Sequence, residues 1–167
     1  MNRNDLVALI RDGVEGPGGV WADLGAGTGA FTGALAEVLG PTAQLIAVDK
    51  DRSALARLSA PARTIVADFT QPLDLPPLDG VLMANSLHFL RHKEPVLSLV
   101  HGYLKPGGRL LVVEYDVDSG NPWVPHPFGF ETWKRLAVEN GFSEPALLGR
   151  HPSQWLRGLY SAVSVRQ

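Results

Sequence analysis

The sequence of 167 residues contains no cysteine, and this absence excludes several kinds of chemistry at once. Without a thiol the chain has no disulfide framework, no thiolate metal site and no cysteine nucleophile, and we assign no metal ligands in it. Charge of one sign is also scarce, because 15 Lys and Arg residues oppose 17 Asp and Glu residues and leave a net charge of −2. That balance argues against a protein that holds nucleic acid chiefly through its phosphates.

Long apolar runs are missing as well. Near the N-terminus the only apolar stretch is residues 6–10, which is far too short for the core of a signal peptide or for a membrane span. We therefore expect a cytoplasmic protein without a membrane partner. What remains is an ordinary globular composition, 45% hydrophobic and 19% charged, over a length that suits one domain with a sizeable core.

Residues 20–32 organise the rest of the sequence. A short apolar run leads into Gly25, Gly27 and Gly29, and a helical pattern of apolar residues follows. Glycine lets the backbone adopt positive φ and approach a ligand closely. The start of the following helix offers free N–H groups and the positive end of a dipole. A strand, a glycine turn and a helix in this order predict a nucleotide-type binding site at the carboxyl edge of a parallel sheet.

Strand-like and helical patterns alternate through the first two thirds of the chain. They predict a doubly wound α/β fold with a mostly parallel sheet, formed by a single domain over residues 1–167. The expected strands are 20–24, 44–48, 64–67, 80–84, 109–114, 145–148 and 159–165. The expected helices are 4–12 (capped by Asn4), 30–39, 53–58, 94–104 and 130–140, and residues 116–129 form a long loop with three prolines.

Asp23, two residues before the first glycine, separates two interpretations of the turn. Gly25, Gly27 and Ala30 satisfy a dinucleotide fingerprint, yet a turn built for a pyrophosphate should not hold a carboxylate beside the anion. A carboxylate there suits a ligand with a cationic group. The string from Asp23 to Gly29, Asp-Leu-Gly-Ala-Gly-Thr-Gly, resembles the first motif of the class I S-adenosylmethionine-dependent methyltransferases, whose cofactor carries a sulfonium and an amino group.

The resemblance covers residues 20–114 and implies the Rossmann-like methyltransferase fold, a seven-stranded sheet with helices on both faces and an antiparallel last strand. It also implies S-adenosyl-L-methionine as the cofactor and methyl transfer as the activity. The residues that we expect to bind the cofactor are Asp23, Gly25, Ala26, Gly27, Thr28, Gly29, Asp49, Lys50, Asp68, Phe69, Asn85 and Ser86.

Some of these residues have a role that can be stated. Asp49 follows the second strand directly, so its carboxylate can accept hydrogen bonds from both ribose hydroxyls. In the resembled family an acid at the position of Asp68 bonds the adenine amino group, and Phe69 would offer a stacking face. A turn acid followed by a core aromatic residue is the alternative for that pair. Asn85 and Ser86 would face the methionine part of the cofactor or the incoming acceptor.

His88 is the candidate catalytic residue, because its unperturbed pKa lies near neutrality and suits proton removal from an acceptor. The alternative is a structural histidine packed beside Phe89 and Leu90. In-line methyl transfer depends mainly on positioning, so no catalytic side chain is compulsory.

The acceptor is expected to be a small molecule. Residues 85–88, Asn-Ser-Leu-His, lack the Pro-Pro and aromatic residue that follow Asn or Asp in exocyclic-amine DNA and RNA methyltransferases of this superfamily. The first helix, the loop 116–129 with Trp123, His126 and Phe128, or a partner subunit such as the second copy in a homodimer would enclose the acceptor. Two other functions stay open: a non-catalytic S-adenosylmethionine-binding subunit and an NAD-dependent oxidoreductase.

Overall fold

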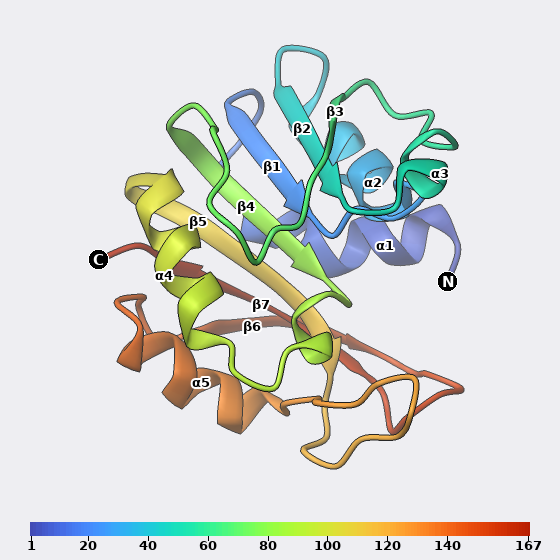
Figure 1. Cartoon of the computed structure of the whole chain (residues 1–167), viewed down its shortest axis with the longest axis vertical. Helices are drawn as coiled ribbons and strands as arrows, with labels where there is room; N and C mark the ends of the chain where they lie inside the picture. Colours follow the sequence, from blue (N-terminus) through green and yellow to red (C-terminus); the bar gives the residue numbers. More distant parts are fainter.

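A seven-stranded sheet runs through the molecule in the order β3-β2-β1-β4-β5-β7-β6, and only β7 is antiparallel to its neighbours (Figure 1). The structure is a computed structural model that describes residues 1–167. The strands are β1 (Val20–Leu24), β2 (Gln44–Asp49), β3 (Arg63–Val66), β4 (Leu78–Ala84), β5 (Leu104–Tyr115), β6 (Ala146–His151) and β7 (Leu159–Val165). The order of connection reverses between β1 and β4, which opens a crevice at their carboxyl ends.

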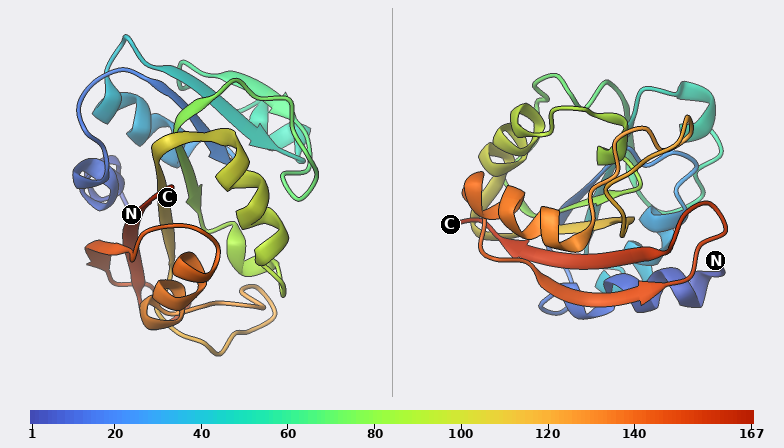
Figure 2. Two further views of the ribbon diagram at one scale, coloured as in Figure 1. Left: turned by 90° about the vertical axis from the view of Figure 1, so that its left-hand side faces the viewer. Right: turned by 90° about the horizontal axis from the view of Figure 1, so that it is seen from below.

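Helices cover both faces of the sheet, as Figures 1 and 2 show. Apolar residues of α1 and α2 form one core with the sheet, and those of α4 and α5 form a second core on the opposite face. The helices are α1 (Arg3–Ile10), α2 (Ala30–Leu39), α3 (Arg52–Leu55), α4 (Glu94–Tyr103) and α5 (Phe130–Glu139), with short 3-10 helices η1 (Arg11–Gly13) and η2 (Leu87–Phe89). None of these helices is long and apolar enough to pass through a membrane.

The first helix begins earlier than the sequence pattern predicted. Asn2, and not Asn4, is its cap, so the expected helix 4–12 was displaced at both ends. The Asn2 side chain accepts from the Asp5 N–H at 3.0 Å, while the Asp5 carboxylate accepts from the Asn2 N–H at 2.9 Å. This reciprocal box requires an acid three residues after the cap, which only Asn2 has.

Strand β5 is longer than the expected segment 109–114. Its pairing with β4 starts at Leu104, which lies opposite Leu78, and resumes at Arg109 opposite Gly80. Residues 105–108 therefore bulge out of the ladder, as a Lys-Pro-Gly-Gly sequence favours. The helix expected over 53–58 is the shorter α3, which begins one residue earlier because the Asp51 side chain caps it by accepting from the N–H groups of residues 53 and 54, and which ends at Leu55. The strands expected over 20–24 and 159–165 and the helix expected over 30–39 are confirmed.

The close packing of Gly80 in β4 against Trp21 in the neighbouring strand β1 gives a stability prediction. A Cβ added at Gly80 would lie 2.3 Å from ring atoms of Trp21, which is buried and pairs with Gly80 in register. We expect Gly80→Ala to lower the free energy of unfolding by about 1–3 kcal/mol through overpacking, measured by urea denaturation. Gly102→Ala is the control, because a Cβ there has nothing within 4 Å, and a helical alanine should raise stability by up to about 1 kcal/mol. An unchanged urea midpoint for Gly80→Ala would contradict this account.

Candidate cofactor site

A cavity of about 280 Å³ lies at the carboxyl edge of the sheet, beside the crevice between β1 and β4. Seven of the residues expected to bind the cofactor line it: Gly25, Asp49, Lys50, Asp68, Phe69, Asn85 and Ser86. They come from the turns that follow β1, β2, β3 and β4, which converge because parallel strands end at the same edge. The other lining residues are Ala67, Thr70, Phe89 and Leu90.

Asp49 holds the glycine turn in place. Its Oδ2 accepts from the Gly27 N–H at 2.8 Å, and its Oδ1 accepts from the Asp51 N–H at 2.8 Å. Gly25 requires positive φ, +83°, and a Cβ there would lie 2.6 Å from the Ser86 Cβ. A carboxylate can accept about four hydrogen bonds, so the fixed Asp49 side chain retains acceptor capacity toward the cavity.

Asp68 is oriented in a similar way by its own turn. Its Oδ1 accepts from the Thr70 N–H at 2.9 Å and from the Thr70 hydroxyl at 2.8 Å. These two hydrogen bonds hold the pKa of Asp68 below its usual value, and the bond from the Thr70 N–H has the larger effect. Asp68 therefore presents an ionised acceptor at one end of the cavity, with the partly buried Phe69 next to it.

The turn after β4 carries the clearest sign of a ligand. Asn85 is the only non-glycine residue with positive φ, +53°, and its Oδ1 is buried without a hydrogen-bond partner. Ser86 is 3% exposed, and its Oγ is also buried without a partner. Orphaned buried polar atoms are costly and rare. Two of the five such atoms in the chain belong to neighbouring residues that line this cavity, where a bound group could satisfy them.

Asp23 lies beneath the glycine turn and does not line the cavity. It is 2% exposed, and its Oδ2 accepts from the Thr32 hydroxyl at 2.7 Å. Burial raises the pKa of Asp23 to about 6, against the lowering effect of the Thr32 hydrogen bond, and the nearby Asp49 raises it further. The carboxylate can therefore act on a ligand through its field, and the direct contact expected from the sequence stays a prediction.

The remaining turn residues, Ala26, Gly27, Thr28 and Gly29, are also not part of the cavity wall. Ala26 donates its N–H to the carbonyl of Val48 at 3.0 Å. A Cβ at Gly29 would lie 2.5 Å from the Leu58 side chain. These residues shape the turn and its packing, and their contact with a cofactor stays a prediction.

His88 is buried and lies outside the cavity wall. It is 3% exposed, and its Nδ1 is 2.8 Å from Oε2 of Glu114, which is 0% exposed. Sequence reasoning did not identify Glu114. The only available signal was a single acid at the end of the apolar strand β5, and the sequence does not show which side chain faces it.

The loop 116–129 packs over η2. The His126 N–H donates to the His88 carbonyl at 2.9 Å, and Lys93 Nζ donates to the His126 carbonyl at 3.0 Å. Of its expected acceptor-facing residues, Phe128 is buried and lies under Lys93, whereas Trp123 is 70% exposed.

Side chains of the loop 116–129 also bind its own backbone. Asp116 and Asp118 accept from the N–H groups of residues 130 and 129, and Asn121 accepts from those of residues 123 and 124. The loop is thus an ordered wall at the carboxyl edge.

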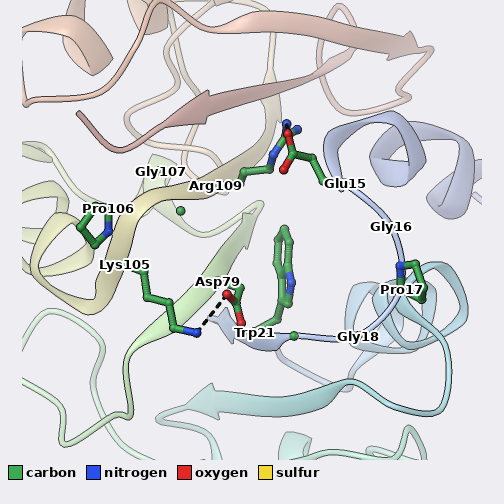
Figure 3. Close-up of a pocket in the computed structure, with 12 residues that line it drawn as sticks. Glu15, Gly16, Pro17, Gly18, Trp21, Asp79, Lys105, Pro106, Gly107 and Arg109 are labelled. Atoms are coloured by element: carbon green, nitrogen blue, oxygen red, sulfur yellow. Dashed lines mark hydrogen bonds and ion pairs between the residues drawn. The ribbon is translucent and has the colours of Figure 1, made fainter.

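A second cavity, of about 270 Å³, opens at the amino ends of β1 and β4 (Figure 3). Its charged groups are paired, Lys105 with Asp79 at 3.1 Å and Arg109 with Glu15 at 2.6 Å, and the Trp21 ring stands beside them. No side chain in it has a buried polar atom without a partner. Ligands of open α/β sheets bind at the carboxyl edge, so we assign no ligand to this cavity.

Residues 22–110, more than half of the chain, match the family model described as a methyltransferase domain. The chain belongs to this family, and the resemblance to class I S-adenosylmethionine-dependent methyltransferases is confirmed. It is 33% identical over 117 residues to the ubiquinone/menaquinone biosynthesis C-methyltransferase UbiE of Ectopseudomonas mendocina, an alignment that covers 64% of this chain and 45% of that protein. The chain thus spans about half the length of the curated relatives that it matches.

Solved structures agree on the fold. The YcgJ protein of Bacillus subtilis superposes with a TM-score of 0.79 at 14% identity, over 98% of this chain and 99% of that one. The 1,6-didemethyltoxoflavin-N1-methyltransferase of Burkholderia thailandensis gives a TM-score of 0.76 at 19% identity, over 99% of this chain and 78% of that one. The expected Rossmann-like methyltransferase fold is confirmed.

The raised pKa of Asp23 predicts a pH-dependent stability. Because the folded protein holds this proton up to about pH 6 and the unfolded chain only to about pH 4, the free energy of unfolding falls as pH rises through that window. Between about pH 4.5 and pH 7.5 the wild type should lose about 2 kcal/mol more than Asp23→Asn, which keeps the acceptor for Thr32. Urea denaturation at both pH values measures the difference.

Asp74→Asn is the control for this measurement, because Asp74 is exposed and makes no hydrogen bond. Its loss of stability between the two pH values should match that of the wild type. If Asp23→Asn also followed the wild type, the raised pKa of Asp23 would be refuted.

Proposed function

We propose that residues 1–167 form an S-adenosylmethionine-dependent methyltransferase domain that transfers a methyl group in line to a small-molecule acceptor. The observation that carries this proposal is the pair of orphaned polar atoms in Asn85 and Ser86, two residues that line the same cavity as the fixed carboxylate of Asp49. Membership of the methyltransferase-domain family supports it.

The residues of the cavity fit the cofactor piece by piece. Asp49 would accept from the two ribose hydroxyls, and Asp68 would accept from the adenine amino group while Phe69 covers the ring. Oδ1 of Asn85 would accept from the amino group of the methionine part, and Ser86 can both donate and accept there. Lys50 borders the ribose end. When bound, the cofactor supplies an electrophilic methyl group on a sulfonium.

The protein contributes alignment of the two reactants, since the sulfonium is already activated. Positioning of this kind can supply about 7–11 kcal/mol of the barrier reduction. The negative charges of Asp23 and Asp49 beneath and beside the turn favour a cationic ligand at this edge. The same charges disfavour binding of a diphosphate, and no observation supports the NAD-dependent oxidoreductase that the sequence left open.

A small-molecule acceptor is supported by the relatives. One is named as a C-methyltransferase of ubiquinone and menaquinone biosynthesis, and another was solved with 1,6-didemethyltoxoflavin and S-adenosylhomocysteine. The loop 116–129 and α1, or a partner subunit, would enclose the acceptor of this chain. The cytoplasmic location and the homodimer expected from the sequence stay predictions.

Asp49→Ala is expected to weaken binding of S-adenosylhomocysteine about ten- to a hundredfold, because about 1.5–3 kcal/mol of charge-assisted hydrogen bonding to the ribose is lost. Titration calorimetry measures the dissociation constant. Asp74→Ala, which removes an exposed carboxylate with no hydrogen bond, is the matched control and should bind as the wild type does. An unchanged dissociation constant for Asp49→Ala would remove the ribose assignment.

The choice of cofactor is tested by thermal shift. S-adenosylhomocysteine at about a hundred times its dissociation constant should raise the apparent stability by about 2.7 kcal/mol and raise the Tm, whereas NAD should leave the Tm unchanged. Methyl-labelled S-adenosylmethionine should then pass label to a small-molecule extract when the protein is present. Stabilisation by NAD, or binding of the labelled cofactor without any transfer, would each refute the proposed activity.

A further inference from the structure

Glu114, at the end of β5, controls both the backbone and the ring of His88. Its Oε1 accepts from the N–H groups of Leu87 and His88 at 3.0 and 3.3 Å, and its Oε2 is 2.8 Å from Nδ1 of His88. The Glu114 carboxylate is 0% exposed. Capping of η2 uses only one carboxylate oxygen, and the second oxygen fixes the imidazole.

This contact sets the tautomer of the His88 ring. An ionised carboxylate only accepts hydrogen bonds, so the hydrogen of the neutral imidazole must be on Nδ1 and the lone pair on Nε2. Nε2 has no hydrogen-bond partner in the protein, and it is not fully buried. The 4% of the His88 side chain that remains exposed therefore includes the nitrogen that can accept a proton.

The His88 ring lies next to the cofactor cavity. His88 follows the cavity residues Asn85 and Ser86 after one residue, and its ring packs on Phe89, another cavity residue, with centroids 4.3 Å apart. The Tyr115 ring lies on its other side at 5.7 Å. The His88 ring therefore lies next to residues of the cofactor cavity, outside the cavity wall itself.

Charged and titratable groups surround the pair. Lys93, 7% exposed, faces Glu114, and burial lowers the pKa of its ammonium while the Glu114 charge opposes that effect. Tyr115 and Tyr160 also face the Glu114 charge, and burial raises the pKa of both phenols. The carboxylate thus has one fixed cation nearby and is placed to stabilise a second positive charge on His88.

We propose that His88 accepts the proton of the substrate group that becomes methylated. Glu114 is the positioning residue of His88. This inference rests on the proposed function and narrows its substrate class to compounds with an ionisable hydroxyl, a phenol or an enol. The acceptor oxygen bonds to the methyl carbon of the sulfonium, the carbon–sulfur bond breaks with its electron pair going to sulfur, and the hydroxyl proton goes to Nε2. The resulting imidazolium lies against the Glu114 carboxylate and returns the proton to water.

The tautomer can be measured without any acceptor. Two-bond ¹H–¹⁵N correlation spectra of the histidine-labelled protein, recorded on the neutral ring, should show the Nδ1–H form for His88. In Glu114→Gln the side-chain amide turns a donor toward Nδ1, so the ring hydrogen should move to Nε2. His88→Gln assigns the signal, and His92→Gln, which removes an exposed histidine four residues away, should leave it unchanged. An Nε2–H tautomer in the wild type would overturn the inference.

Label transfer to the small-molecule extract tests the role itself. Glu114→Gln and His88→Gln should each lower the rate about a hundredfold or more, while the dissociation constant of S-adenosylhomocysteine stays within about twofold. His88→Gln should also change the shape of the pH profile of the rate, which a purely structural role would not change. Transfer at the wild-type rate by the folded His88→Gln variant would overturn this inference alone. A wild-type protein that transfers no label would refute the proposed function and the proton-acceptor role with it.

Discussion

The hydrogen bonds between the Asp49 carboxylate and the turns around it hold the candidate site together. One carboxylate at the end of β2 fixes the glycine turn after β1 through Gly27 and its own following turn through Asp51. A turn of three glycines has much conformational entropy to lose, and a charge-assisted bond to its backbone offsets part of that cost. The same carboxylate then faces the cavity with its remaining acceptor capacity, so the shape of the turn and the recognition of a ligand depend on one side chain.

The turn after β4 links two polar centres. On one side, Asn85 and Ser86 line the cofactor cavity, and each has a buried side-chain oxygen without a hydrogen-bond partner. On the other side, the Glu114 carboxylate of β5 holds the His88 ring. Because β4 lies between β1 and β5 in the sheet, the end of this strand is the one place where a cofactor bound over β1 and a proton acceptor anchored on β5 can meet. The match to the methyltransferase-domain family begins in β1, includes all of β4 and extends into β5, where it ends before Glu114.

Structural features encoded within a few residues could be predicted from the sequence, whereas side-chain contacts between residues far apart in the sequence could not. The glycine turn, the acid after β2 and the helix Ala30–Leu39 were predictable, because each is encoded within a few residues. The contact between His88 and Glu114 joins residues 26 apart, and a single acid after an apolar strand carries no sign of its partner. Direct contact of Asp23 with the ligand was expected from its spacing to Gly25 and stays a prediction, and the hydrogen bond that its carboxylate accepts from Thr32 could not be predicted from the sequence.

The loop 116–129 has a consequence for how this scaffold can diversify. Its backbone is tied by its own Asp and Asn side chains and by Lys93, whereas Trp123 near its tip projects into solvent. A rigid frame with a free tip separates folding from surface shape: exchanging Trp123 alters the surface that the loop presents at little cost to the rest of the chain.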